Sequence, residues 1–442
     1  MILPCCASAT GNSPKSGSPS IWPGSCNNSK QPPKGQSRWC RSRNTSKLRN
    51  QMAEQSRMDK VKEGMDGSRL DEIRTVLNKE KLSPLVCKAL KRADVEIATW
   101  DCVQVKGGIS GNQIYQVSGT VLVDHRPVLW SLFLKILNRS TDVIDISDTD
   151  WKREPLAYQE GLLTNFPNGL RAAECYRLDY ISDTEIWMWL EDVSEPEDSI
   201  WPLKRYGLLA RYLGQFNGAY LTSRPLPTHN WLVRGFEREA IPRDCKWDAF
   251  NLSLDYLQGN RLLSSASAQS AIRLWEEKED VLGRLYGHLP QTFSHFDSDR
   301  RNVFCRTKPD GFEEFALIDW GLVGIGAIGQ ELKNLVFFSL FFSAVEMDRS
   351  KELYAIALDG YLKGLDEAGW NGDPALVRYG CAFTTGLWLL RVWSHCGVMI
   401  PDRDKRQWTE EFHQRPFQDV MGLFAQITAF AMELVDEARD IV

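Results

Sequence analysis

The pattern of apolar residues changes near Glu195, and this change limits the possible folds more than any other feature. Before it, segments rich in β-branched residues or alternating apolar with polar ones are typical of strands. They are VEIATWDCVQV, QIYQVSGTVLV, VLWSLFLKIL, AAECYRLDYIS and EIWMWLEDV. After it, apolar residues recur at helical spacing over 200–222, 268–287, 329–345, 351–366, 374–394 and 409–439. The sequence therefore predicts an α+β fold, a small sheet followed by a mostly helical half.

Two helical patterns accompany the early strands, at 70–90 with an interruption near Pro84, and at 150–163. In the later half only FEEFALIDW and the segment around Val303 look like strands. The predicted organisation is a tail at 1–67, a sheet-containing lobe at 68–193 and a helical lobe at 194–442. We expect a ligand in the cleft between the two lobes.

The first fifty residues contain eight Lys or Arg and no Asp or Glu, and they are rich in Ser, Pro, Gly and Asn. Because the whole chain carries −5 at pH 7, the remaining residues carry −13, which disfavours nucleic acid as the main partner. So polar a tail buries too little apolar surface to fold, and we expect disorder there. Its composition also resembles a transit peptide. The alternative, which we favour, is that translation begins at Met52, Met58 or Met65.

Cysteine spacing and apolar run lengths bear on the compartment. Four of the eleven cysteines lie in the tail, and the other seven are scattered with no CxxC pair. Neither a zinc site nor a disulfide framework is indicated, so a reducing cytoplasm is predicted. The longest apolar run, LVFFSLFFSAV at 335–345, is too short to span a membrane and predicts a buried helix.

The stretch SHFDSDRRNVF at 294–304 combines acids, bases and an abrupt apolar end. It contains His295, Asp297 and Asn302, and Asp319 follows later at the end of the apolar segment FALIDW. Phosphoryl transfer needs a carboxylate to accept the hydroxyl proton, and oxygen ligands that hold magnesium against phosphates. An Asp five residues before an Asn, with another Asp on a later strand, suits these roles. Taken alone, the spacing also fits a solvated surface loop.

Phosphoryl transfer also requires residues that bind the nucleotide phosphates, and candidates for them lie earlier in the chain. The turn GGISGN supplies Gly108, Ser110 and Gly111 between two strands, where backbone N–H groups would cover phosphates; a plain hairpin turn has the same composition. Lys135 lies within an apolar strand and is suited to reach phosphates, because a lysine with apolar neighbours on both faces is poorly solvated. Glu154 on the following helix is the candidate partner of this lysine. The alternatives are that Glu160 is the partner or that Glu154 has only a surface role, because exposed glutamates are common on helices.

With these motifs in order, the sequence resembles the aminoglycoside phosphotransferase and choline kinase superfamily of small-molecule kinases. The strongest matches are HFDSDRRNVF and LIDWGLVGIG; GGISGNQIYQV and WKREPLAY look like its nucleotide loop and its lysine-partner helix. The resemblance covers roughly residues 85–435. It implies a bilobal protein-kinase-like fold, ATP or GTP as phosphate donor, magnesium as cofactor, and a small-molecule hydroxyl as acceptor.

The resemblance also assigns roles by position. Asp297 is similar to the catalytic base, Asn302 and Asp319 to the metal ligands, and Lys135 and Glu154 to the phosphate-binding pair. The hinge that holds the nucleotide base by backbone groups falls at Leu190–Val193, with Glu191 and Val193 as its contacts. His295 is expected to brace the loop.

Some residues depart from the family pattern. Phe296 stands where Gly or Asn is usual, and Gln330 and Glu331 stand where many members begin a helix with Asp. Arg300 and Arg301 are expected to pair with neighbouring acids or to neutralise phosphate.

The acceptor and the catalytic competence stay open. The helix LWLLRVWSHCGV, with Trp388, Arg391, Trp393 and His395, either lines an acceptor site or packs in the core, and its apolar faces favour the core. The leading hypothesis is a small-molecule kinase, and the alternative is a nucleotide-binding regulator with weak catalysis, for which Phe296 is the support. A protein kinase is disfavoured, because GIGAIGQEL leads almost directly into a helix. The sequence does not determine whether ATP or GTP is the phosphate donor, and it does not determine the oligomeric state.

Overall fold

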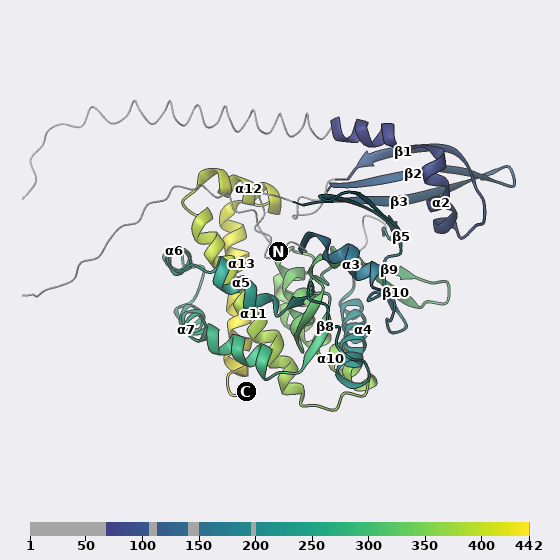
Figure 1. Ribbon diagram of the computed structural model, residues 1–442. Helices are drawn as coiled ribbons and strands as arrows, with labels where there is room; N and C mark the ends of the chain where they lie inside the picture. Colours follow the sequence, from purple (N-terminus) through teal and green to yellow (C-terminus); the bar gives the residue numbers. More distant parts are fainter. Residues whose placement is uncertain (1–67, 106–112, 140–149, 196–199, 442) are drawn as a thin grey trace, which may run out of the picture. The chain divides into compact units, whose positions relative to one another are not determined.

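The computed structural model describes residues 68–105, 113–139, 150–195 and 200–441. They belong to two compact units that divide between Ile136 and Leu137. The predicted α+β class is confirmed, because long strands concentrate before Glu195 and helices after it (Figure 1). The lobe boundary predicted at 193–194 stays a prediction.

The first unit contains an antiparallel meander of strands β1 (Glu96–Gln104), β2 (Gln113–Val123) and β3 (Arg126–Asn138), the last running across the division. Asp124 and His125 close the β2–β3 hairpin, and both have positive φ, 49° and 63°. Two such residues in succession are required by the tight turn that matches the twist of paired strands. The strands therefore keep the register that places Lys135 opposite Ile114.

Helix α2 (Lys79–Leu90) also belongs to the first unit. The predicted interruption near Pro84 is wrong, because Pro84 lies inside this helix. The break lies earlier, where the Asn78 side chain accepts a hydrogen bond from the Lys81 N–H at 2.9 Å and so begins α2. A proline in the second turn removes one backbone donor without ending the helix.

The second unit contains one hairpin and two small sheets. Strands β5 (Cys175–Ser182) and β6 (Glu185–Glu191) pair antiparallel. One sheet has the order β4-β10-β9 and the other β7-β11-β8. Their strands are β4 (Leu170–Ala172), β7 (Val233–Arg234), β8 (Gln291–Ser294), β9 (Val303–Thr307), β10 (Glu313–Leu317) and β11 (Gly324–Ala327). Strands β4, β7, β8 and β11 were not predicted, because two to four residues are too few to show alternation.

The helices of the second unit surround an apolar core. They are α3 (Arg153–Gln159), α4 (Leu203–Thr222), α5 (Phe236–Asp244), α6 (Trp247–Gly259), α7 (Ser265–Gly287), α8 (Gln330–Leu332), α9 (Ser339–Phe341), α10 (Ser350–Glu367), α11 (Pro374–Met399), α12 (Arg403–His413) and α13 (Phe417–Ala438). Helices α5 and α6 were not predicted. The segment predicted as one helix at 329–345 contains a π-helical stretch, Lys333–Phe338. The one predicted at 409–439 is interrupted at Gln414, which has a φ of 50°.

Among the described residues, no helix is both long enough and apolar enough to cross a membrane.

Candidate active site

The loop at 295–302 leaves β8 and enters β9, so both of its ends are anchored in sheets. Two backbone hydrogen bonds shape it: the Asp299 N–H donates to the Asp297 carbonyl at 2.9 Å, and the Asn302 N–H donates to the Asp299 carbonyl at 3.0 Å. Phe296 has a φ of 64°, a conformation that aromatic residues rarely adopt. The loop is therefore a constrained turn, unlike a solvated surface segment.

Asp297 and Asn302 are in direct contact. The Asn302 side-chain Nδ2 donates to Asp297 Oδ2 at 2.8 Å and to the Asp297 carbonyl at 2.9 Å. The other carboxylate oxygen, Oδ1, is buried and accepts no hydrogen bond from the described residues. A buried acceptor without a donor is unfavourable unless a ligand or water supplies one. Asp297 therefore has one oxygen held in place by Asn302 and one that lacks a donor among the described residues.

The electrostatic surroundings of Asp297 are mixed. Burial raises the pKa of its carboxyl above the ordinary value, and the nearby negative charges of Asp299 and Asp319 raise it further. The guanidinium of Arg301 opposes this shift. Asp297 and Asp319 therefore lie close enough for each to sense the charge of the other.

His295 joins the loop to the segment that carries Asp319. Its Nδ1 accepts from the Asp297 N–H at 3.1 Å, which leaves Nε2 to carry the proton and donate to the Ile318 carbonyl at 2.9 Å. Both ring nitrogens are thus used in structural contacts, which confirms the predicted bracing role. Asp319 follows Ile318 with a φ of 59°, so the backbone turns sharply at this aspartate.

Glu154 lies at the start of α3 and is 2% exposed. Its Oε1 accepts a hydrogen bond of 3.3 Å from the N–H of Trp320, the residue after Asp319. The neighbouring Arg153 donates to the Gly321 carbonyl at 2.8 Å, so two successive residues of α3 fasten this segment. The rival Glu160 is exposed at the end of the same helix.

Lys135 lies in β3 of the first unit and is 5% exposed, so it is no solvated surface lysine. Because Glu154 belongs to the second unit, the ion pair between the two side chains stays a prediction. The nucleotide-loop residues Gly108, Ser110 and Gly111 lie outside the described residues.

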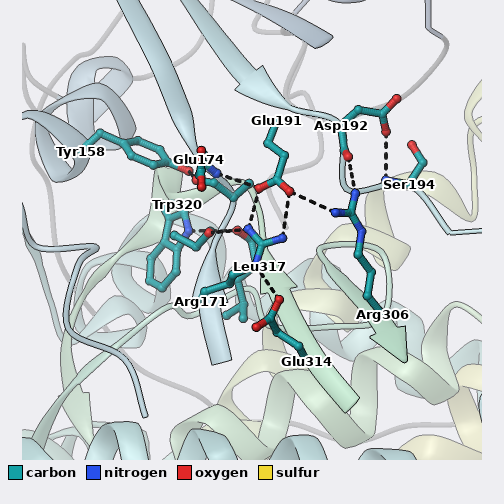
Figure 2. A network of polar contacts seen from close by, with 12 residues as sticks. Tyr158, Arg171, Glu174, Glu191, Asp192, Ser194, Arg306, Glu314, Leu317 and Trp320 are labelled. Carbon is teal, nitrogen blue, oxygen red and sulfur yellow. Dashed lines mark hydrogen bonds and ion pairs between the residues drawn. The ribbon is translucent and has the colours of Figure 1, made fainter. Parts of the chain in front are cut away.

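The candidate hinge is part of a polar network (Figure 2). The Glu191 carboxylate accepts from Arg171 at 2.5 and 2.9 Å and from Arg306 at 3.3 Å. The Glu191 N–H donates to the Glu174 carbonyl at 2.9 Å. Val193 is buried beside Ala173 and Ala316. The carboxylate of Glu191 is thus engaged within the protein, and any contact of this residue with a nucleotide base falls to its backbone.

A magnesium ion would find oxygen donors here. Among the described residues, no group of three or more His, Cys, Asp or Glu side chains is placed to share one metal. The Asp319 carboxylate and the Asn302 amide oxygen are hard ligands of the kind magnesium takes when phosphates and water complete its coordination. Because the amide nitrogen of Asn302 points at Asp297, its oxygen points elsewhere and is suited to such a contact.

Glu331 was not recognised as part of the site. Its carboxylate accepts from the Phe296 N–H at 2.9 Å and from the Ser298 hydroxyl, so it holds the loop from behind. The Phe296 ring is buried and packs against Gly326, where an added Cβ would lie 2.6 Å from the ring. The bulky ring at Phe296 is therefore accommodated by a glycine opposite it. The available signal in the sequence was the acid two residues after Gly329, at the start of a predicted helix.

The two arginines of the loop pair with acids, as expected. Arg300 lies 2.9 Å from Glu195, and Arg301 lies 2.6 Å from Asp299.

In α11, Trp388 and Trp393 are 2% and 0% exposed, so the core position favoured for this helix is confirmed.

Comparison with known proteins gives structural matches only. No protein-family model matches the sequence, and no curated protein matches it. Similar solved structures include a microcompartment-associated aminopropanol kinase, with 14% identity over 80% of this chain and 98% of the other and a TM-score of 0.48. A choline kinase from Cryptosporidium parvum Iowa II has 12% identity over 76% and 90%, with a TM-score of 0.43.

A third match is a spectinomycin phosphotransferase in complex with ADP and spectinomycin, with 14% identity over 81% and 99% of the two chains and a TM-score of 0.44. All three are kinases or phosphotransferases.

Proposed function

We propose that this protein is a kinase that transfers the terminal phosphate of ATP or GTP to a hydroxyl group of a small molecule. The observation that carries the proposal is the Asp297 carboxylate. Asn302 holds one of its oxygens, the other is buried without a donor, and His295 joins this loop to the segment that carries Asp319. This combination suits a base that accepts the acceptor's proton while phosphate is transferred.

In the proposal each residue has a separate task. Asp297 orients the acceptor hydroxyl and takes its proton. Asp319 and Asn302 hold magnesium, which when bound supplies positive charge against the developing charge on the phosphates. Lys135, held by Glu154, contacts the nucleotide phosphates, with the backbone of Gly108, Ser110 and Gly111 covering them. The backbone of Glu191 and Val193 holds the nucleotide base. The proposed location of the protein is the cytoplasm.

The test is a screen of hydroxyl compounds for acceptor-stimulated ADP or GDP release, with magnesium and each nucleotide in turn. The wild type is compared with Asp319→Asn and with Asp359→Asn, an exposed aspartate on α10 that serves as the matched control. We expect release that depends on one acceptor class, disappears in Asp319→Asn and persists in Asp359→Asn. Nucleotide binding by the wild type without stimulated release by any acceptor would favour the regulatory alternative. An equal signal in wild type and Asp319→Asn would refute the metal role.

A further inference from the structure

The segment 191–195, at the end of β6, carries three carboxylates, and those of Glu191 and Glu195 contact the same later part of the chain. Glu191 contacts Arg306, whose guanidinium also donates to the Asp192 carbonyl at 2.6 Å (Figure 2). Glu195 accepts from the Cys305 N–H and from Arg300. These contacts fasten the segment 191–195 along β9.

Strand β9 begins at Val303, directly after Asn302. The residues that fasten the candidate hinge are therefore continuous with the loop that holds Asp297. Arg300 belongs to this loop, so its contact with Glu195 joins the loop directly to the segment 191–195.

Of the residues that contact the segment 191–195, Arg300 is the nearest to Asp297 in the sequence. Its guanidinium donates to Glu195 Oε2 at 2.9 Å and to the Val303 carbonyl at 3.1 Å, and it lies 4.4 Å from the centre of the Trp201 ring. Trp201 Nε1 donates to the same oxygen of Glu195 at 3.1 Å. The Glu195 side chain is only 5% exposed, so this charge depends on its partners. Arg300 is thus directed at Glu195, and a phosphate would have to compete for it.

We infer that the ion pair of Glu195 and Arg300 couples the hinge to the catalytic loop, with both as positioning residues. This inference rests on the proposed kinase function. The hinge sets where the nucleotide lies, and the loop sets where the acceptor hydroxyl lies. A misplacement of about 1 Å between reacting groups reduces rates by up to about a hundredfold, so a link between the two matters.

The test is a double-mutant cycle of Glu195→Gln and Arg300→Gln, with Arg403→Gln on α12 as an exposed control. The measurements are kcat, and KM for the nucleotide and the acceptor, at a temperature where each variant is folded. We expect each single variant to lower kcat by roughly tenfold, and the double variant to be no worse than the poorer single one. Arg300→Lys should recover part of the loss, because it keeps the charge but not the planar contact with Trp201.

Several outcomes would overturn the inference while leaving the kinase proposal intact. Losses that multiply in the double variant would mean that the two residues act separately. A loss in Arg300→Gln with full activity in Glu195→Gln would mean that Arg300 acts on phosphate. Unchanged kcat in both single variants, with a lower melting temperature, would reduce the pair to a structural contact. A wild type without acceptor-stimulated turnover would refute the kinase proposal itself, and the inference with it.

Discussion

The loop at 295–302 and helix α11 are both conspicuous in the sequence, the first for its charges and the second for its tryptophans. In the structure the loop and the tryptophans of α11 differ in how their polar groups are satisfied. The loop keeps a buried oxygen of Asp297 without a donor and holds Phe296 at a positive φ. In α11 the indole N–H of Trp393 donates to the Thr428 hydroxyl at 2.8 Å, and Trp388 packs against Phe338. An unsatisfied buried oxygen together with a strained backbone, a combination that stability alone disfavours, is the better sign of a functional site.

The variant Asp297→Ala is the strongest test of the difference between the loop and helix α11. We expect a loss of turnover of about a thousandfold or more, because general base catalysis contributes on the order of 10² to 10⁴. Nucleotide affinity should change little, since the base acts on the acceptor. Steady-state kinetics and nucleotide titration would measure the two. Full turnover in this variant would remove the loop from the chemistry.

The next test concerns the helix, through Trp388→Ala. We expect the free energy of unfolding to fall by about 3–5 kcal/mol, because the residue is buried against Phe338 and Phe341. Chemical denaturation would measure this, and acceptor KM in the folded variant should match the wild type. A raised acceptor KM with unchanged stability would instead make α11 part of a binding site.

A smaller effect is expected from Gly326→Ala, which links the loop to β11. The added Cβ would meet the Phe296 ring at 2.6 Å, so we expect destabilisation of about 1–3 kcal/mol. In a Phe296→Asn background the cost should be smaller, because the ring is gone and asparagine tolerates positive φ. The contact of the added Cβ with Gln330 Oε1, at 2.5 Å, would remain. Denaturation of all four proteins would show this coupling, and additive effects would contradict it.

The smallest effect concerns pH and the helical region. Burial, aided by Arg415, lowers the pKa of His413 to about 4. A histidine with a depressed folded-state pKa loses stability as pH falls from about 6.5 towards 4, because the unfolded chain takes the proton first. Between pH 7 and 5 we expect this residue to account for a loss on the order of 1 kcal/mol. His413→Gln should lack this part of the pH dependence in denaturation experiments, and an identical pH profile would refute the assignment.

Much of the fold was predictable, because alternation and helical spacing report which faces are buried. The meander β1–β3 and the helices α4, α7, α10 and α11 follow these patterns closely. The short strands β7, β8 and β11 did not, since pairing with distant strands sustains them. That Asp297 and Asn302 lie near each other was also predictable, because both belong to one short loop.

The sequence by itself determined the α+β class, the order of the motifs and the chemical types available to a site, because these depend on local pattern and side-chain chemistry. Only the tertiary structure decided that Glu331 supports the loop, that Glu195 pairs with Arg300, and that the tryptophans of α11 are core. The physical reason is that burial and pairing depend on residues far apart in the chain. The sequence around a glutamate does not show whether its charge is satisfied by solvent or by an arginine about a hundred residues away.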